Sequence, residues 1–235
     1  MNATRWDQIH APHGIASLRH THWLDGDPQA YEGAPGRWHA GDGAVIGTGI
    51  DGIGDIVLAP FAETVIGAVK LRAFARDGAL ALRVYDPENP ARVQLTGIES
   101  YAPDAAWALT GRYEPAAVGE ERLIRSVDGH ESTHPAGGRV TLMIRGEERT
   151  LIVSDDGGAL NAVIADASAS GGTYPFRFLP IGAPDAAGAV TVDFNRAYLP
   201  PCAFSDQYVC PLPPPENRLP IAVTAGERRA LRADS

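Results

Sequence analysis

Lysine and cysteine are scarce in this chain, which has one lysine, Lys70, and two cysteines, Cys202 and Cys210, among 235 residues. Nucleic-acid phosphates are bound by clustered Lys and Arg, so a single lysine and a net charge of −9 predict no nucleic-acid partner. No stretch reaches the roughly 18 apolar residues of a membrane helix. The polar start, residues 1–7, lacks the apolar region of a signal peptide. We therefore expect a cytoplasmic protein with no membrane partner, in which both cysteines stay reduced.

Glycine and proline are frequent, at 26 and 19 residues, and favour many turns between short strands. Alternating apolar and polar residues predict strands at 15–24, 44–48, 55–58, 65–76, 80–85, 93–99, 107–113, 122–127, 139–144, 150–153, 160–164, 176–179 and 189–194. A short helix is expected at 5–10. The fold class predicted is all-β, an antiparallel meander forming a barrel or a two-sheet sandwich. We expect one domain over 1–235: an irregular segment at 1–42, the meander at 43–195 and a proline-rich strap at 196–235.

Glycine motifs within the meander have two interpretations. Asp77-Gly78 is the dipeptide that best fits a tight hairpin, because both central residues need a positive φ. Gly47, Gly49 and Gly52 match the pattern G-x-G-x-x-G, which can bind a dinucleotide when a helix follows. The residues after Gly52 make a poor helix start, so we favour a glycine-rich β turn.

The strap, residues 196–235, carries seven prolines between 200 and 220. Proline lacks a backbone donor, so this segment cannot join a central strand. We expect it to lie extended over the β domain and to bury Phe204, Tyr208, Leu212 and Leu219. The alternative is a polyproline segment that binds another protein.

Histidines and cysteines are candidate metal ligands or redox groups. His20 and His22 project to one face of a strand, which allows a metal site if a third ligand comes from elsewhere. Packing or surface histidines are the commoner explanation, so no metal is expected. Cys202 and Cys210 could form a disulfide, bind a metal or be buried thiols, and buried thiols are favoured.

Polar side chains on one face of the last predicted strand point to a network or a ligand. Thr191, Asp193 and Asn195 share that face, and a buried polar face must be satisfied. The side chains that could complete it are Arg83, Asp166, Tyr174 and Arg177. The alternative, which we weight more heavily, is a structural network that clamps the strap through Asn217, Arg218 and Glu227.

Several blocks resemble a bacterial family of unknown function, domain family 1684. They are residues 166–174 (DASASGGTY), 177–179 (RFL), 193–204 (DFNRAYLPPCAF), 210–214 (CPLPP), 216–220 (ENRLP) and 225–227 (AGE). Trp23-Leu24, residues 83–86 and residues 101–111 also look like family positions. The resemblance implies no activity. It implies that Tyr174, Arg177, Asp193, Asn195 and Tyr198 form a recurring constellation.

We favour a cofactor-free small-molecule enzyme that uses acid–base chemistry in a β-barrel pocket, of hydrolase, lyase or isomerase type. His22 would transfer the proton, and Asp193 would orient or tune the histidine. The side chains expected to hold an anionic or carbonyl-bearing substrate are Arg83, Tyr174, Arg177, Asn195 and Tyr198. One alternative is a non-catalytic protein that binds a small ligand; another is a metal-dependent enzyme using His20 and His22. A homodimer is compatible with either.

Overall fold

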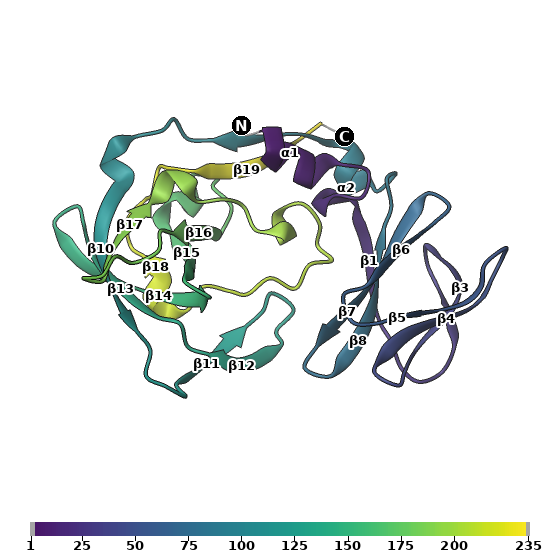
Figure 1. The fold of residues 1–235 in the computed structure, drawn as a ribbon. Helices are drawn as coiled ribbons and strands as arrows, with labels where there is room; N and C mark the ends of the chain where they lie inside the picture. The colour runs from purple at the N-terminus through teal and green to yellow at the C-terminus, as the bar shows by residue number, and fades with distance from the viewer. Residues whose placement is uncertain (1–2, 234–235) are drawn as a thin grey trace. The chain divides into compact units, whose positions relative to one another are not determined.

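The protein is seen in a computed structural model, which describes residues 3–233 (Figure 1). The chain is all-β, and its strands pair antiparallel except for one short parallel pair, which confirms the predicted fold class. Its contacts divide it into two compact units, each described by itself. Unit 1 contains residues 3–96, Phe204–Tyr208 and residues 232–233; unit 2 contains Gly97–Ala203 and Val209–Leu231. The expectation of one domain stays a prediction.

Unit 1 contains two antiparallel sheets, one of order β1-β8-β7-β6 and one of order β2-β3-β4-β5. Its elements are α1 (Ala3–His10), the 3-10 helix η1 (Ile15–Ser17), β1 (Leu18–Trp23), β2 (Gln29–Tyr31), β3 (Ala34–Gly41), β4 (Ala44–Ile50), β5 (Gly54–Leu58), β6 (Glu63–Ile66), β7 (Val69–Arg76), β8 (Ala79–Tyr85) and α2 (Pro90–Val93). The N-terminal segment expected to be irregular therefore contains a helix and three strands. The strands β2 and β3 were not predicted because their glycines, prolines and polar residues interrupt the alternation of apolar and polar residues.

The glycine-rich stretch of β4 is a hairpin, as we favoured, and not a dinucleotide site. Gly47 lies opposite Trp38 of β3, and a Cβ on Gly47 would come within 2.7 Å of the Trp38 ring. Gly47 is therefore required for the indole, which is fully buried, to lie flat on the sheet. Gly49 and Gly52 have positive φ and turn the chain into β5. No helix follows.

Two further turns set the register of unit 1. Asp77 and Gly78 have φ of 48° and 81°, which confirms the predicted tight hairpin between β7 and β8. The strand predicted over 65–76 is wrong as one element, because Gly67, with φ of 60°, divides it into β6 and β7. Val65 and Val69 continue the apolar pattern across this turn, so periodicity alone does not reveal it.

Unit 2 is built on one seven-stranded sheet of order β16-β15-β14-β13-β10-β17, with β18 added to β15. Its strands are β10 (Ala108–Pro115), β13 (Gly138–Ile144), β14 (Glu147–Asp156), β15 (Ala159–Asp166), β16 (Arg177–Ile181), β17 (Ala189–Asp193) and β18 (Arg218–Leu219). The sheet curls until its end strands meet, where the Gly182 N–H donates to the Thr191 carbonyl at 3.1 Å. Trp107, Leu151, Ile164 and Phe194 pack inside it.

Outside this sheet, unit 2 contains the hairpin β11 (Glu121–Arg125) and β12 (Glu131–Pro135). The strap contributes β19 (Glu227–Arg232), which pairs with β9 (Leu95–Ser100). Five 3-10 helices occur here: η2 (Ala105–Trp107), η3 (Ala167–Gly171), η4 (Phe194–Arg196), η5 (Pro201–Ala203) and η6 (Pro215–Asn217). The strap is thus extended, as predicted, but gains a strand at its end. No helix among residues 3–233 is long and apolar enough to cross a membrane.

Candidate ligand-binding site

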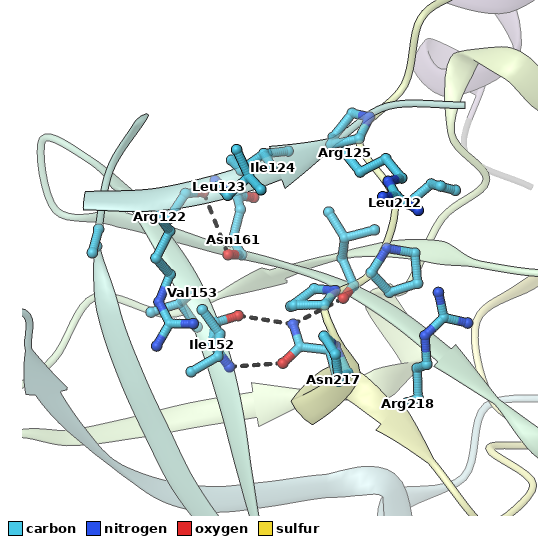
Figure 2. Close-up of a pocket in the computed structure, with 18 of the residues that line it drawn as sticks. Arg122, Leu123, Ile124, Arg125, Ile152, Val153, Asn161, Leu212, Asn217 and Arg218 are labelled. Atoms are coloured by element: carbon cyan, nitrogen blue, oxygen red, sulfur yellow. Dashed lines mark hydrogen bonds between the residues drawn. The ribbon is translucent and has the colours of Figure 1, made fainter. Parts of the chain in front are cut away.

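Unit 2 contains a cavity of about 580 Å³ between the β11–β12 hairpin, the strands β14 and β15, and residues 211–218 of the strap (Figure 2). Its apolar lining includes Ile124, Ile152, Val163 and Leu212 together with the prolines of the strap. A volume of several hundred Å³ is typical of sites that enclose a small molecule. The cavity is therefore the first candidate for a functional site in this unit.

The wall of the cavity that the strap forms consists largely of prolines, which lack a backbone N–H donor. Val127 N–H donates to the Cys210 carbonyl at 2.9 Å, and Leu212 N–H donates to the Arg125 carbonyl at 2.8 Å. Between these bonds, Pro211 forms an isolated antiparallel bridge with Ser126. Proline needs no backbone acceptor and has a fixed φ, so the wall presents apolar rings without leaving unpaired donors. Its shape is largely set before any ligand arrives.

Asn217 fixes the other end of this wall. Its side chain is fully buried and points to β14 and β15 (Figure 2). The Asn217 Oδ1 accepts a hydrogen bond from Ile152 N–H at 2.7 Å, and Nδ2 donates to the carbonyls of Ile152 and Val163, each at 2.9 Å. An amide is the side chain that offers both an acceptor and two donors at one position. Asn217 therefore attaches the strap to the sheet, as the structural interpretation predicted.

Three arginines supply positive charge to the cavity lining: Arg122, Arg125 and Arg218. Arg125 is committed to Glu131, with N–O distances of 2.8 and 2.5 Å, and Arg122 lies 3.6 Å from a carboxylate oxygen of Glu216. Among the described residues, the guanidinium of Arg218 has no hydrogen-bond or ion-pair partner. It is exposed, at the start of β18, so its five N–H donors are open to an anion.

The side chains that line the cavity can bind a ligand but include few groups that could transfer a proton. Histidine, cysteine and lysine are absent from the lining residues that the structure describes. Its one carboxylate, Glu131, is already bonded to Arg125. A general acid or base near neutral pH is therefore not offered by these side chains. What they offer is apolar surface beside a guanidinium.

Arg177, predicted to hold substrate, lies in the interior of unit 2 with none of its surface exposed. Its Nη2 donates to Asp166 Oδ2 at 2.6 Å and to the Val223 carbonyl at 3.0 Å, and its Nη1 donates to the Ala225 carbonyl at 2.5 Å. Asp166 Oδ1 accepts from Val223 N–H at 2.9 Å. The pair therefore clamps the strap around residues 223–227.

Asp193 and Asn195 do not share a strand face, which corrects the prediction. The strand β17 ends at Asp193, and Asp193 caps η4 by accepting from the backbone and side-chain nitrogens of Asn195 at 3.0 and 2.8 Å. Asn195 also exchanges two hydrogen bonds with the backbone of Asp104. An Asp at a strand end satisfies the free N–H groups of the next turn, which the period-2 pattern does not reveal.

Tyr198 and Tyr174 lie elsewhere in unit 2. The backbone of Tyr198 pairs with Phe178, and the two rings meet edge to face at 5.7 Å. The Tyr174 hydroxyl donates to the Sγ of Cys202 at 3.4 Å. Neither tyrosine lines the cavity. A shared substrate-binding role for these two side chains stays a prediction.

The two remaining predicted residues, His22 and Arg83, belong to unit 1. His22 stacks on His20 at 5.1 Å, as expected for two residues on one strand face, and its Nε2 lies 2.9 Å from the Glu32 carbonyl oxygen. Arg83, 8% exposed, lies over the ring of Phe74 at 3.7 Å and that of Tyr208 at 5.3 Å. His22 and Asp193 thus fall in different units, and their joint action stays a prediction.

Metal ligation has no further support within the described part of the chain. No group of three or more His, Cys, Asp or Glu side chains in residues 3–233 is arranged to hold a metal ion. Glu32 Oε1 lies 3.8 Å from His20 Nε2, so this acid is a neighbour of the histidine pair without completing such a group.

Comparison with known proteins places the chain in a family. A family model described as "Protein of unknown function (DUF1684)" matches residues 93–228, more than half of the chain. The chain belongs to the DUF1684 family. The match covers the whole cavity of unit 2, and it confirms the resemblance in the terminal blocks. No curated protein matches the chain.

A solved structure is similar to part of this DUF1684 member. It is the solution NMR structure of an uncharacterized protein of Haloarcula marismortui, with 27% sequence identity and a TM-score of 0.46. The alignment covers 57% of this chain and 76% of that one.

The arginines of the cavity were not predicted as site residues. Arg122 was assigned to a strand and Arg218 to the strap network, but no sequence pattern shows that β11 and the strap enclose a space. The available signal was the concentration of prolines beside apolar residues at 211–215, which indicates a rigid apolar wall.

Proposed function

We propose that this protein binds a small anionic molecule with an apolar body in the cavity of unit 2, without a catalytic step. A non-catalytic ligand-binding protein is the alternative that the sequence left open. The observation that carries it is the unpaired guanidinium of Arg218 beside a preformed apolar cavity of about 580 Å³. The apolar walls receive the body of the ligand, and Arg218 receives its acidic group.

Charge and geometry favour a carboxylate, sulfonate or phosphate over a neutral ligand. A guanidinium presents donors in a planar fork that matches two oxygens of such a group. The protein as a whole carries a net charge of −9, so it does not attract anions over long distances. An anionic ligand would therefore be held by direct contact with the guanidinium. The rigid proline wall lowers the entropy that binding must remove.

Two fluorescent probes with similar apolar bodies test this proposal. 1-Anilinonaphthalene-8-sulfonate carries an anionic group, and N-phenyl-1-naphthylamine lacks it. Fluorescence titration should give saturable binding of both probes at one site per chain. Arg218→Met, which keeps an apolar stem, should weaken binding of the sulfonate about tenfold. It should leave binding of the neutral amine nearly unchanged.

Arg139→Met is the matched control, because Arg139 is an exposed arginine of the same unit outside the cavity lining. A second variant, Val163→Trp, fills the cavity and should weaken binding of both probes. Equal loss of sulfonate binding in the Arg218 and Arg139 variants would rule out a specific anion contact. Probe binding that survives Val163→Trp in a folded protein would place the probes outside the cavity.

A further inference from the structure

Two thiols lie where the chain passes from one unit to the other and back. Cys202 and Cys210 belong to unit 2, whereas Phe204–Tyr208 between them belong to unit 1. Within unit 1, the Ser205 hydroxyl donates to the Leu18 carbonyl at 2.6 Å, and the Tyr208 hydroxyl donates to the Ile15 carbonyl at 3.1 Å. The segment 204–208 is thus held at several points, with one cysteine on each side of it.

The two cysteines are neighbours in space and neither is in a disulfide. The Cys202 backbone N–H donates to the Sγ of Cys210 at 3.4 Å, and the Tyr174 hydroxyl donates to the Sγ of Cys202 at 3.4 Å. Cys202 is partly exposed, whereas Cys210 is 5% exposed. The arrangement therefore pairs a partly exposed cysteine, Cys202, which we call the outer thiol, with a buried one, Cys210.

Hydrogen bonding activates the outer thiol. The hydrogen bond with the Cys210 thiol, aided by that from Tyr174, lowers the pKa of Cys202 to about 7 against the opposing effect of burial. Burial raises the pKa of Tyr174, and its bond to Cys202 adds to this effect, so the phenol keeps its proton and remains a donor. Near neutral pH a large fraction of Cys202 is then thiolate, the form that attacks disulfides.

We propose that Cys202 and Cys210 are a reversible dithiol–disulfide pair that is oxidised by low-molecular-weight disulfides such as oxidised glutathione. The Cys202 thiolate attacks one sulfur of the oxidant and forms a mixed disulfide, and the first glutathione leaves as a thiolate. Cys210 then loses its proton to solvent and attacks Cys202 Sγ, which releases the second glutathione. The protein gives up two electrons and two protons, and the oxidant becomes two thiols. A reduced dithiol reverses the steps.

Tyr174 is a positioning residue in this scheme, because it acts through the Cys202 sulfur. The product disulfide would close the loop that carries residues 203–209. This inference does not depend on the cavity, since neither cysteine lines it.

Redox titration of the full chain tests the proposal. The protein is equilibrated in glutathione buffers of increasing oxidised fraction, free thiols are alkylated, and intact mass is measured. Wild type should convert to a species that lacks two hydrogens, takes up no alkyl group and carries no glutathione. Persistence of the dithiol in fully oxidised glutathione, accumulation of the mixed disulfide, or covalent dimers would each overturn it.

Variants assign the two roles. Cys210→Ser should stop at one glutathione bound to Cys202, and Cys202→Ser should slow reaction with the oxidant at least about tenfold near neutral pH. Tyr174→Phe should move the pH–rate profile of mixed-disulfide formation to higher pH, a change that a purely structural tyrosine would not produce. An unmoved profile in a folded Tyr174→Phe protein would remove Tyr174 from the scheme. The wild-type titration stands even if a variant fails to fold.

Discussion

Each unit buries one arginine against the strap, but the two arginines are stabilised in different ways. In unit 2, Arg177 is bonded to the Asp166 carboxylate and to strap carbonyls. In unit 1, Arg83 lies over the ring of Phe74 and near that of Tyr208, and it shares a side-chain hydrogen bond with Tyr85. Burial lowers the pKa of Arg83. Tyr208 belongs to the strap, as do the carbonyls around Arg177.

The two guanidinium groups depend on their partners to different degrees. Removing Arg177 leaves a buried carboxylate and several carbonyls without their donor. Removing Arg83 leaves the rings of Phe74 and Tyr208, which need no partner, and takes one hydrogen bond from the side chain of Tyr85. Guanidinium–ring contacts contribute about 0.5–2 kcal/mol, whereas breaking a buried ion pair costs about 3–5 kcal/mol. Both arginines were predicted to bind substrate, and in both units the contacts are those of a strap clamp.

Arg177→Met should destabilise the protein most. It should lower the free energy of unfolding by about 3–5 kcal/mol, because Asp166 stays buried without its cation. Urea denaturation measures the loss. Hydrogen exchange should show faster opening of residues 223–227, with 204–208 unaffected.

A double-mutant cycle with Asp166→Asn checks the cause of this loss. The coupling between the two sites should be at least about 1 kcal/mol, since each side chain is the other's partner. Additive losses would show that Arg177 acts through its carbonyl contacts alone.

The next effect is that of Asn217→Asp, an isosteric change. The new oxygen cannot donate to the carbonyls of Ile152 and Val163, so the free energy of unfolding should fall by about 2–3 kcal/mol near neutral pH. Protonation restores one donor, so the deficit relative to wild type should shrink as the pH is lowered. Chemical denaturation at several pH values measures it, and a deficit that grows in acid would contradict the assigned amide geometry.

Arg83→Met should have a smaller effect, about 1–2 kcal/mol, because the methionine stem retains contact with Phe74 and Tyr208. Hydrogen exchange should now rise in 204–208 and not in 223–227. A loss as large as that of Arg177→Met would mean that the contrast between the two clamps is wrong.

The sequence was informative where one residue type forces one geometry. Asp77-Gly78 predicted its hairpin because few other dipeptides tolerate two positive φ values, and the prolines predicted an extended strap because they cannot donate. Asn217 was predicted to help hold the strap, but the backbone groups of Ile152 and Val163 that it bonds were not predicted.

The sequence was uninformative where geometry depends on distant segments. The residues Arg122 and Arg218 are separated by most of unit 2 in the chain, and only the folded sheet brings them to one cavity. The prediction that Asp193 and Asn195 share a strand face was wrong for a local reason. Asp193 caps the 3-10 helix η4, so the backbone there is not extended as an alternating pattern assumes. The strand β3 was missed because its stability comes from pairing with β4 and from the space above Gly47.

The change in stability should be smallest at His20 of unit 1, a partly buried imidazole that contrasts with the two charged arginines. Burial first, and then the charge of His22, lowers the pKa of His20 below its ordinary value of 6.5. Glu32 and Asp86 oppose this shift, and Arg19 adds to it. The unfolded chain therefore binds a proton at a pH where the folded chain does not. Stability from this site is present above pH 6.5 and is lost as the pH falls toward the folded pKa.

His20→Gln should accordingly reduce the loss of unfolding free energy between about pH 7.5 and about pH 5.5, measured by urea denaturation at each pH. His134→Gln, which removes an exposed imidazole from β12 in unit 2, is the control for the loss of one histidine. If His20→Gln steepened the acid loss, the neighbouring Glu32 and Asp86 would outweigh burial, and the protonated imidazole would be stabilised in the fold. That result would make His20 an acid-stabilised cation like Arg177, held by carboxylates, where we infer a ring kept neutral by its surroundings.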